Sequence, residues 1–235
     1  PLTGIYGAAS ALWENPGKLP EETKKSLARN IMEDSAWLIR MVENLLSVTR
    51  IQAENAELST VEEAAEEIIS SAASRVRHSY PGREIRLSVP QALLMVPMDS
   101  TLISQVLINL MENALEYSPI DSPVTVRLYA ETGTHESRAV FEVQDEGPGI
   151  PEELLPTLFD TAPIAPMQPP PTANTPASSG AGRPDARRGM GIGLSLCFSI
   201  VTAHHGTMEA RQVLTGGMLF RFSLPLAPTT RKESP

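Results

Sequence analysis

The stretch VLINLMENALEYSP, residues 106–119, gathers amides and carboxylates at helical spacing. Four polar positions fall at i, i+3, i+4 and i+7, so a helix places on one side Asn109, Glu112, Asn113 and Glu116. The intervening positions are apolar, namely Leu107, Leu110, Met111, Ala114 and Leu115. Such a polar stripe could offer oxygen ligands to a hard cation such as Mg²⁺, or could simply face water.

A glycine-containing motif, DEGPGIP, follows an alternating apolar segment. Gly147 and Gly149 allow the backbone to turn sharply and a ligand to approach closely. Asp145, at the end of the preceding segment, would be a fixed acceptor suited to an exocyclic amino group such as that of adenine. A D-x-G-x-G pattern by itself is also compatible with a turn that binds no ligand.

A second glycine motif, GMGIGLSL, places Gly189, Gly191 and Gly193 directly before an apolar helical segment. Unshielded N–H groups at a helix N-terminus attract phosphate oxygens. The motif is neither a Walker loop nor a dinucleotide fingerprint, because it lacks G-x-x-x-x-G-K and a following βαβ unit. Three arginines just upstream could reach phosphates or remain solvated: Arg183, Arg187 and Arg188.

The patterns around these motifs predict an α+β domain over residues 58–226. Helical periodicity is expected at 61–80, 99–117, 152–159 and 191–205. Alternating apolar residues predict strands at 84–90, 93–99, 124–131, 138–145, 207–213 and 218–225. The sheet should be mostly antiparallel, with the helices as a second layer.

Residues 1–54 predict a helical hairpin around the loop NPGKLP. The second helix, about 21–51, carries a near-heptad seam of Leu27, Ile31, Leu38, Met41, Val42, Leu45 and Val48. One hairpin offers too little apolar partner surface, so we expect a dimeric four-helix bundle. Helical spacing begins at Leu2 with no polar cap, which indicates a cut inside a longer helix, although Pro1 could also occupy a first turn.

Composition limits the possible partners and the location. A net charge of -9 over 235 residues argues against nucleic acid or an anionic membrane surface. The single cysteine, Cys197, lies in an apolar run and is expected to be buried and inert. No run reaches the ~18 apolar residues that span a bilayer, so we expect a soluble, cytoplasmic chain. The Pro/Ala-rich segment 161–182 predicts a mobile lid, about 160–188, and 227–235 a disordered tail.

The ordered motifs resemble the catalytic core of two-component sensor histidine kinases, which share an ATP-binding fold with gyrase, Hsp90 and MutL. NLMENALEYSP resembles the N box, DEGPGIP the G1 box, LLPTLFD the F box, GMGIGLSL the G2 box and GGMLFRF the final glycine motif. More narrowly, MVENLLSVTRIQ and RGMGIGLSLC are similar to sensor kinases of Kdp potassium-transport systems. The resemblance implies a helical-hairpin dimerisation and phosphotransfer domain followed by a two-layer α/β sandwich.

The resemblance also implies roles for individual residues. Asn113 would be the Mg²⁺ ligand, Asn109 a nucleotide-phosphate contact, and Asp145 the partner of the adenine amino group. Gly147 and Gly149 would shape the ATP pocket. The phosphate side would be lined by Gly189, Gly191 and Gly193, with Arg187 and Arg188 near it. The implied cofactors are ATP and Mg²⁺, and the implied partners are a second copy of the chain and a response-regulator receiver domain. Membrane attachment would depend on segments outside this sequence.

Three features depart from the family pattern. The family's H box ends in Pro-Leu, so Pro1 and Leu2 place the phosphoacceptor histidine upstream of this sequence; its own histidines, His78, His135, His204 and His205, fall in other elements. Glu116 stands where a Lys or Arg commonly helps to hold phosphates, which should weaken ATP binding. The F box has Phe159 but Ala162 in place of a second aromatic residue, which leaves the anchoring of the lid open.

Three functions remain open from the sequence. The leading hypothesis is an ATP:protein-histidine phosphotransferase core that binds ATP but, without the histidine, does not phosphorylate itself. An ATPase of the gyrase or Hsp90 kind needs a glutamate base about one turn before the metal-binding Asn; Asn109 stands there, while the neighbouring Glu112 keeps the question open. A degenerate kinase acting as a nucleotide-binding dimerisation module is favoured by Glu116, the altered F box and the unusual lid.

Overall fold

The computed structural model describes residues 1–15, 17–52, 58, 60–133, 136–159, 190–214 and 216–226, and within these it leaves out the side chains of residues 37, 40, 41, 43–52 and 190–192. The predicted lid at 160–188 and tail at 227–235 lie outside the described residues. The chain divides into two compact units, Pro1–Ala53 and Glu54–Pro235. Among the described residues, no helix combines the length and the apolar character needed to cross a bilayer.

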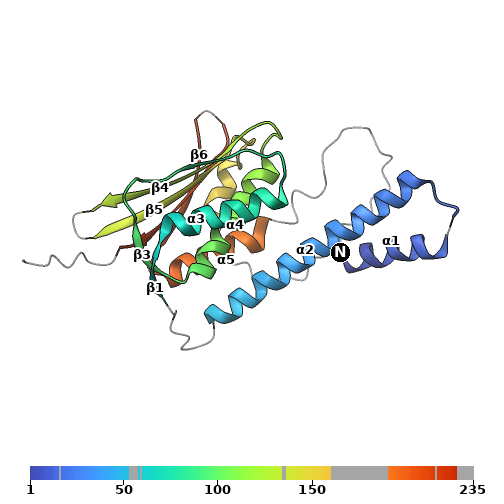
Figure 1. The fold of residues 1–235 in the computed structure, drawn as a ribbon, viewed down its shortest axis with the longest axis horizontal. Helices are drawn as coiled ribbons and strands as arrows, with labels where there is room; N and C mark the ends of the chain where they lie inside the picture. The colour runs from blue at the N-terminus through green and yellow to red at the C-terminus, as the bar shows by residue number, and fades with distance from the viewer. Residues whose placement is uncertain are drawn as a thin grey trace, which may run out of the picture. The chain divides into compact units, whose positions relative to one another are not determined.

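The first unit is a hairpin of two helices, α1 (Leu2–Glu14) and α2 (Glu21–Gln52). The two helices pack against each other (Figure 1). They approach so closely that a side chain at Gly4 would overlap the carboxylate of Asp34. Helix α1 begins after Pro1 without a side-chain cap, as its sequence predicts. Several large apolar side chains of the unit are exposed: Leu2, Tyr6, Trp13, Met32, Ile39 and Val42.

The second unit is built on a five-stranded sheet in the order β2-β4-β5-β7-β6. The strands are β2 (Ile85–Ser88), β4 (Val124–Thr132), β5 (Ser137–Gln144), β6 (Thr207–Gln212) and β7 (Met218–Pro225). The pair β2–β4 is parallel and the other three pairs are antiparallel, so the sheet is mostly antiparallel as predicted. The register brings Phe141 opposite Phe222, and their rings stack with centroids 4.5 Å apart.

Three helices form the second layer: α3 (Ala65–Ser79), α4 (Ser100–Tyr117) and α5 (Met190–Ala203). They lie together on one face of the sheet (Figure 1). Helix α4 packs against both α3 and α5, and its neighbours bury most of its residues. Its N-terminus is capped by Asp99, whose Oδ1 accepts hydrogen bonds from the backbone N–H groups of Thr101 and Leu102. The unit therefore has the two-layer α+β architecture expected from the sequence.

One predicted helix was wrong in its first residues. Residues 61–80 were expected to form one helix, but Val61–Ala64 is a strand, β1, which pairs antiparallel with β3 (Met95–Met98) in a separate two-stranded sheet. Local propensity favours a helix here, yet the ladder to β3 offers backbone partners that the sequence pattern does not reveal. The short helix predicted at 152–159 is present as a 3₁₀ helix, Glu152–Thr157, which contains Pro156, a residue with no N–H to donate.

Candidate functional site

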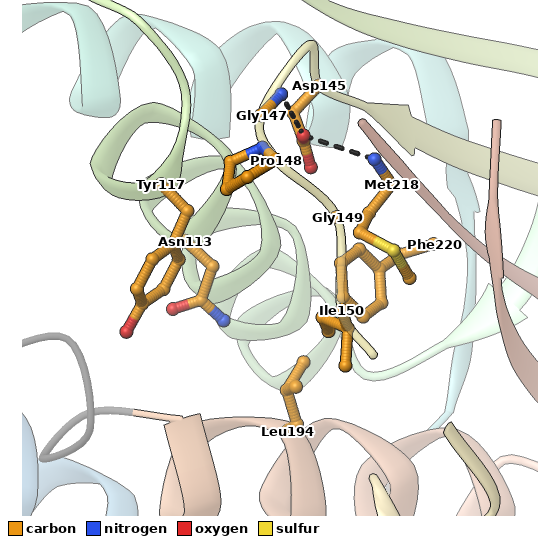
Figure 2. A pocket seen from close by; sticks show the side chains of 10 residues that line it. All are labelled: Asn113, Tyr117, Asp145, Gly147, Pro148, Gly149, Ile150, Leu194, Met218 and Phe220. Atoms are coloured by element: carbon orange, nitrogen blue, oxygen red, sulfur yellow. Dashed lines mark hydrogen bonds between the residues drawn. The ribbon is translucent and has the colours of Figure 1, made fainter. Parts of the chain in front are cut away.

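A pocket opens where the end of α4, the loop after β5, helix α5 and the start of β7 meet (Figure 2). The residues around it are Asn113, Tyr117, Asp145, Gly147, Pro148, Gly149, Ile150, Leu194, Met218 and Phe220. Four of the predicted site residues are therefore neighbours in space: Asn113, Asp145, Gly147 and Gly149.

Asp145 is the buried charged group of this pocket, with only 4% of its surface exposed. Its Oδ1 accepts hydrogen bonds from the backbone N–H groups of Gly147, at 2.7 Å, and Met218, at 3.1 Å (Figure 2). Burial raises the pKa of Asp145, and the two N–H groups oppose that rise by stabilising the carboxylate. Among the described residues both recorded bonds end on Oδ1, so Oδ2 can accept from a ligand.

Glycines allow three backbone segments to meet around Asp145. A Cβ atom at Gly147 would lie 2.7 Å from the carbonyl oxygen of Tyr117, so this loop passes directly against the end of α4. Gly217 has φ = +89°, and a Cβ there would overlap the carbonyl oxygen of Asp145. Gly149 also has a positive φ of +80°. The loop after β5 and the start of β7 can approach this closely only because these positions lack side chains.

Helix α4 contributes an amide and a phenol to the wall of the pocket that faces Met218 and Phe220. Asn113 and Tyr117 are four residues apart, so both side chains lie on one face of the helix. Figure 2 shows them on one side of the pocket, with Met218 and Phe220 on the other and Leu194 reaching in from α5. Apolar walls with a carboxylate at one end suit a flat heterocycle that carries an amino group. The amide oxygen of Asn113 is available to a cation beside it.

Asn109 lies elsewhere. It is buried and does not belong to the residues around the pocket. Its Oδ1 accepts a hydrogen bond from Gln105 at 3.0 Å, and its Nδ2 donates to Sγ of Cys197 at 3.8 Å, so the side chain links α4 to α5. The contact with a nucleotide phosphate stays a prediction. Cys197 is buried as expected, and burial raises the pKa of its thiol to about 12.

The predicted phosphate side is described only in part. Gly191 and Gly193 lie in the first turns of α5, and a Cβ at Gly193 would meet no atom within 4 Å. Gly189, Arg187 and Arg188 lie outside the described residues, so their roles stay predictions. Glu116 is exposed.

The F-box aromatic residue has a partner that the sequence did not reveal. The ring of Phe159 stacks on Phe198 of α5 with centroids 5.6 Å apart. The described end of the F box is therefore anchored on α5, while Ala162 lies outside the described residues.

Sequence reasoning missed the apolar half of the pocket. Leu194, Met218 and Phe220 look like ordinary core residues, and their types carry no sign of a ligand site. Tyr117 could have been found, because it stands one turn beyond Asn113 on the same face of α4. Of the histidines that the structure describes, His78 and His205 are exposed and His204 is buried. The ring of His204 accepts a hydrogen bond from the N–H of Asp99 at 3.0 Å, which is a structural role.

A model of one protein family, described as histidine kinase-, DNA gyrase B- and HSP90-like ATPase, matches residues 98–228. That range contains α4, the loop after β5 and the start of β7. The chain belongs to this family. The assignment confirms the resemblance to the histidine kinase, gyrase and Hsp90 fold.

Two curated relatives are sensor proteins named KdpD. The chain is 40% identical over 225 residues to the one from Clostridium acetobutylicum and 29% identical over 230 residues to the one from Escherichia coli K12. Each match covers 96% of this chain but only 23% of the relative. The narrower resemblance to Kdp sensor kinases is confirmed, and the chain spans about a quarter of the length of these relatives.

Solved structures of histidine kinases share the fold. The Acinetobacter baumannii histidine kinase AdeS superposes with a TM-score of 0.64 at 19% identity, covering 97% of this chain and 95% of AdeS. Full-length ShkA, solved in complex with AMPPNP, has a TM-score of 0.62 at 23% identity and covers 97% of this chain and 43% of ShkA. At these identities the likeness establishes the fold alone.

Proposed function

We propose that this chain is the ATP-binding core of a KdpD-like sensor histidine kinase. It would transfer the γ-phosphoryl group of ATP to a histidine, from which the group passes to an aspartate of a response-regulator receiver domain. The observation that carries the proposal is the pocket itself, which sets the buried carboxylate of Asp145 across an apolar slot from the amide of Asn113. The solved complex of ShkA with AMPPNP gives independent support for an adenine nucleotide as the ligand of this fold.

Each wall of the pocket has a role in this proposal. Oδ2 of Asp145 accepts a hydrogen bond from the adenine amino group, and Phe220, Met218 and Leu194 pack on the ring. Among the described residues, no group of three His, Cys, Asp or Glu side chains gathers as metal ligands. Mg²⁺ commonly uses few protein ligands and takes the rest from phosphates and water, so the single oxygen of Asn113 fits that ion. Mg²⁺ would neutralise charge on the phosphates during transfer.

The helical hairpin supplies the proposed dimer interface. Trp13 is 86% exposed and Tyr6 76%, and both lie on α1 together with exposed Leu2. Burying these side chains against a second hairpin gives the four-helix bundle expected from the sequence. A longer protein, of the kind that the KdpD relatives represent, would supply the phosphoacceptor histidine and a membrane anchor, and this part of it would be cytoplasmic. A role in potassium or osmotic signalling follows only from the likeness to the KdpD sensor proteins.

Calorimetric titration tests the pocket directly. The chain is titrated with ADP and with a non-hydrolysable ATP analogue, each with and without Mg²⁺. We expect Mg²⁺-dependent binding of the analogue, loss of the Mg²⁺ dependence in Asn113→Ala, and loss of binding in Asp145→Ala. A chain extended by the H-box histidine should then phosphorylate itself. Absence of binding at millimolar nucleotide would refute the proposal.

Exposed Glu116 favours a second candidate, a degenerate kinase that binds nucleotide as a dimerisation module. A carboxylate one turn from Asn113 repels phosphates unless a cation or an arginine intervenes. Nucleotide binding without autophosphorylation of the extended chain would support this candidate, and Glu116→Lys should then strengthen binding. An ATPase of the gyrase kind has less support, because the amide of Asn109 cannot act as a base and is already bonded to Gln105 and Cys197.

A further inference from the structure

We propose that Arg83, which lies outside the matched family region and outside every motif in the sequence, is a positioning residue for the nucleotide pocket. It holds the C-terminal end of α4, and through that end it holds both Tyr117 and the loop that carries Gly147. The inference rests on the proposed function for the nature of the ligand, but its structural content can be tested without a ligand.

A tight turn presents Arg83 to α4. The chain leaves α3 through Tyr80, Pro81 and Gly82, and the N–H of Arg83 donates to the carbonyl of Tyr80 at 3.2 Å. Proline fixes φ at the second position of such a turn, and Gly82 has the positive φ of +85° that the third position requires. The turn therefore directs the guanidinium away from α3 and towards the neighbouring helix end.

The guanidinium of Arg83 closes the end of α4 with three hydrogen bonds. Nη1 donates to the carbonyl of Leu115 at 2.8 Å, and Nη2 donates to Oγ of Ser118 at 2.9 Å and to the carbonyl of Pro119 at 3.0 Å. The last carbonyls of a helix lack partners within the helix and carry its negative dipole end, so a cation there is doubly favourable. Nε of Arg83 is buried with no hydrogen-bond partner among the described residues, so the side chain interacts through its two terminal nitrogens.

The clamped segment is also a wall of the pocket. Tyr117 lies between Leu115 and Ser118, two of the three residues to which the Arg83 guanidinium is bonded. Its side chain faces the pocket, and its carbonyl oxygen is the atom that a Cβ at Gly147 would approach to 2.7 Å. If the last turn of α4 loosens, both the phenol ring and the support of the loop after Asp145 move. Arg83 thus acts on the ligand through Tyr117 and Gly147 without touching it.

Arg77 provides a matched control. It is also an arginine near the end of α3 that bonds a backbone carbonyl, since its Nη2 donates to Ile85 of β2 at 2.7 Å. Among the described residues, no hydrogen bond or ion pair joins Arg77 to α4. We expect Arg83→Ala to raise the Kd for nucleotide about three- to tenfold, the usual scale for residues that act through a neighbour. Arg77→Ala, which removes a hydrogen bond to β2 and none to α4, should leave Kd unchanged. Arg83→Lys, which keeps the charge and one donor group, should restore part of the affinity.

Hydrogen–deuterium exchange of the full chain without nucleotide gives the second readout. Arg83→Ala should speed exchange in peptides covering residues 111–119 and 145–149, and Arg77→Ala should not. Equal changes of Kd in both alanine variants, or unchanged exchange at α4 in Arg83→Ala, would overturn the proposal. If the wild-type chain binds no nucleotide, the proposed function fails while exchange still decides the role of Arg83. If Arg83→Ala does not fold, Arg83→Gln replaces it in both measurements.

Discussion

Replacing Gly193 by alanine should raise the stability of the chain and lower its affinity for nucleotide. Gly193 lies within α5, its φ is not positive, and an added Cβ would meet no atom within 4 Å. Nothing that the structure describes around this position therefore requires a glycine. If the space beside it receives phosphate oxygens, as the family resemblance predicts, the added methyl group weakens only the complex.

The two effects have opposite signs. Alanine in place of glycine inside a helix stabilises it by ~0.5–1 kcal/mol, which raises the melting temperature by roughly 1–4 °C for a unit of this size. A methyl group in the path of the phosphates costs the complex one charge-assisted hydrogen bond, ~1.5–3 kcal/mol. That loss corresponds to a Kd about 10- to 150-fold higher.

The assay pairs thermal unfolding with calorimetric titration of a Mg²⁺-ATP analogue. Gly7→Ala is the matched control, since Gly7 also lies inside a helix, α1, and a Cβ there also meets no atom within 4 Å. We expect both variants to melt at or above the wild-type temperature, and only Gly193→Ala to lose affinity. Unchanged affinity in Gly193→Ala would refute the placement of phosphates beside this residue. A melting temperature of Gly193→Ala below that of the wild type would contradict the free space for a Cβ at this position.

Three further results are expected. Gly217→Ala should lower the free energy of unfolding by ~2–4 kcal/mol, because its Cβ overlaps the carbonyl of Asp145 at a φ of +89°; an unchanged urea midpoint by circular dichroism would contradict this. Burial lowers the pKa of His204 below its ordinary 6.5. As the pH falls, the unfolded chain therefore binds a proton at His204 before the folded chain does, and the free energy of unfolding decreases below about pH 6.5. Urea titrations at pH 7.5 and 5.5 should show that His204→Gln removes part of this dependence and that His78→Gln, at an exposed position, keeps it. Cys197, buried with a pKa of about 12, should react with a thiol reagent at pH 8 only after unfolding, and rapid labelling of the native chain would contradict its burial.

Much of the pocket could be predicted from spacing alone. Asn113 was placed on a helix face by periodicity, and Asp145, Gly147 and Gly149 were placed in a turn after a strand, because these features depend on residues only a few positions apart. Periodicity was less informative where packing against another element decides whether a side chain faces the pocket. Asn109 shares the stripe with Asn113, yet the packing of α5 against α4 buries its amide against Cys197, 88 residues away.

The local sequence therefore determined the α+β class, the order of the motifs, the face of α4 that carries Asn113 and the turn after Asp145. Only the tertiary structure decided which distant segments complete the site. The N–H of Met218 reaches Asp145 across 73 residues, and the guanidinium of Arg83 reaches Leu115 across 32. It also decided that Val61–Ala64 is a strand, since β3 is its partner. Helix periodicity and turn chemistry are short-range effects, whereas a hydrogen bond between remote residues exists only once packing has brought both to one place.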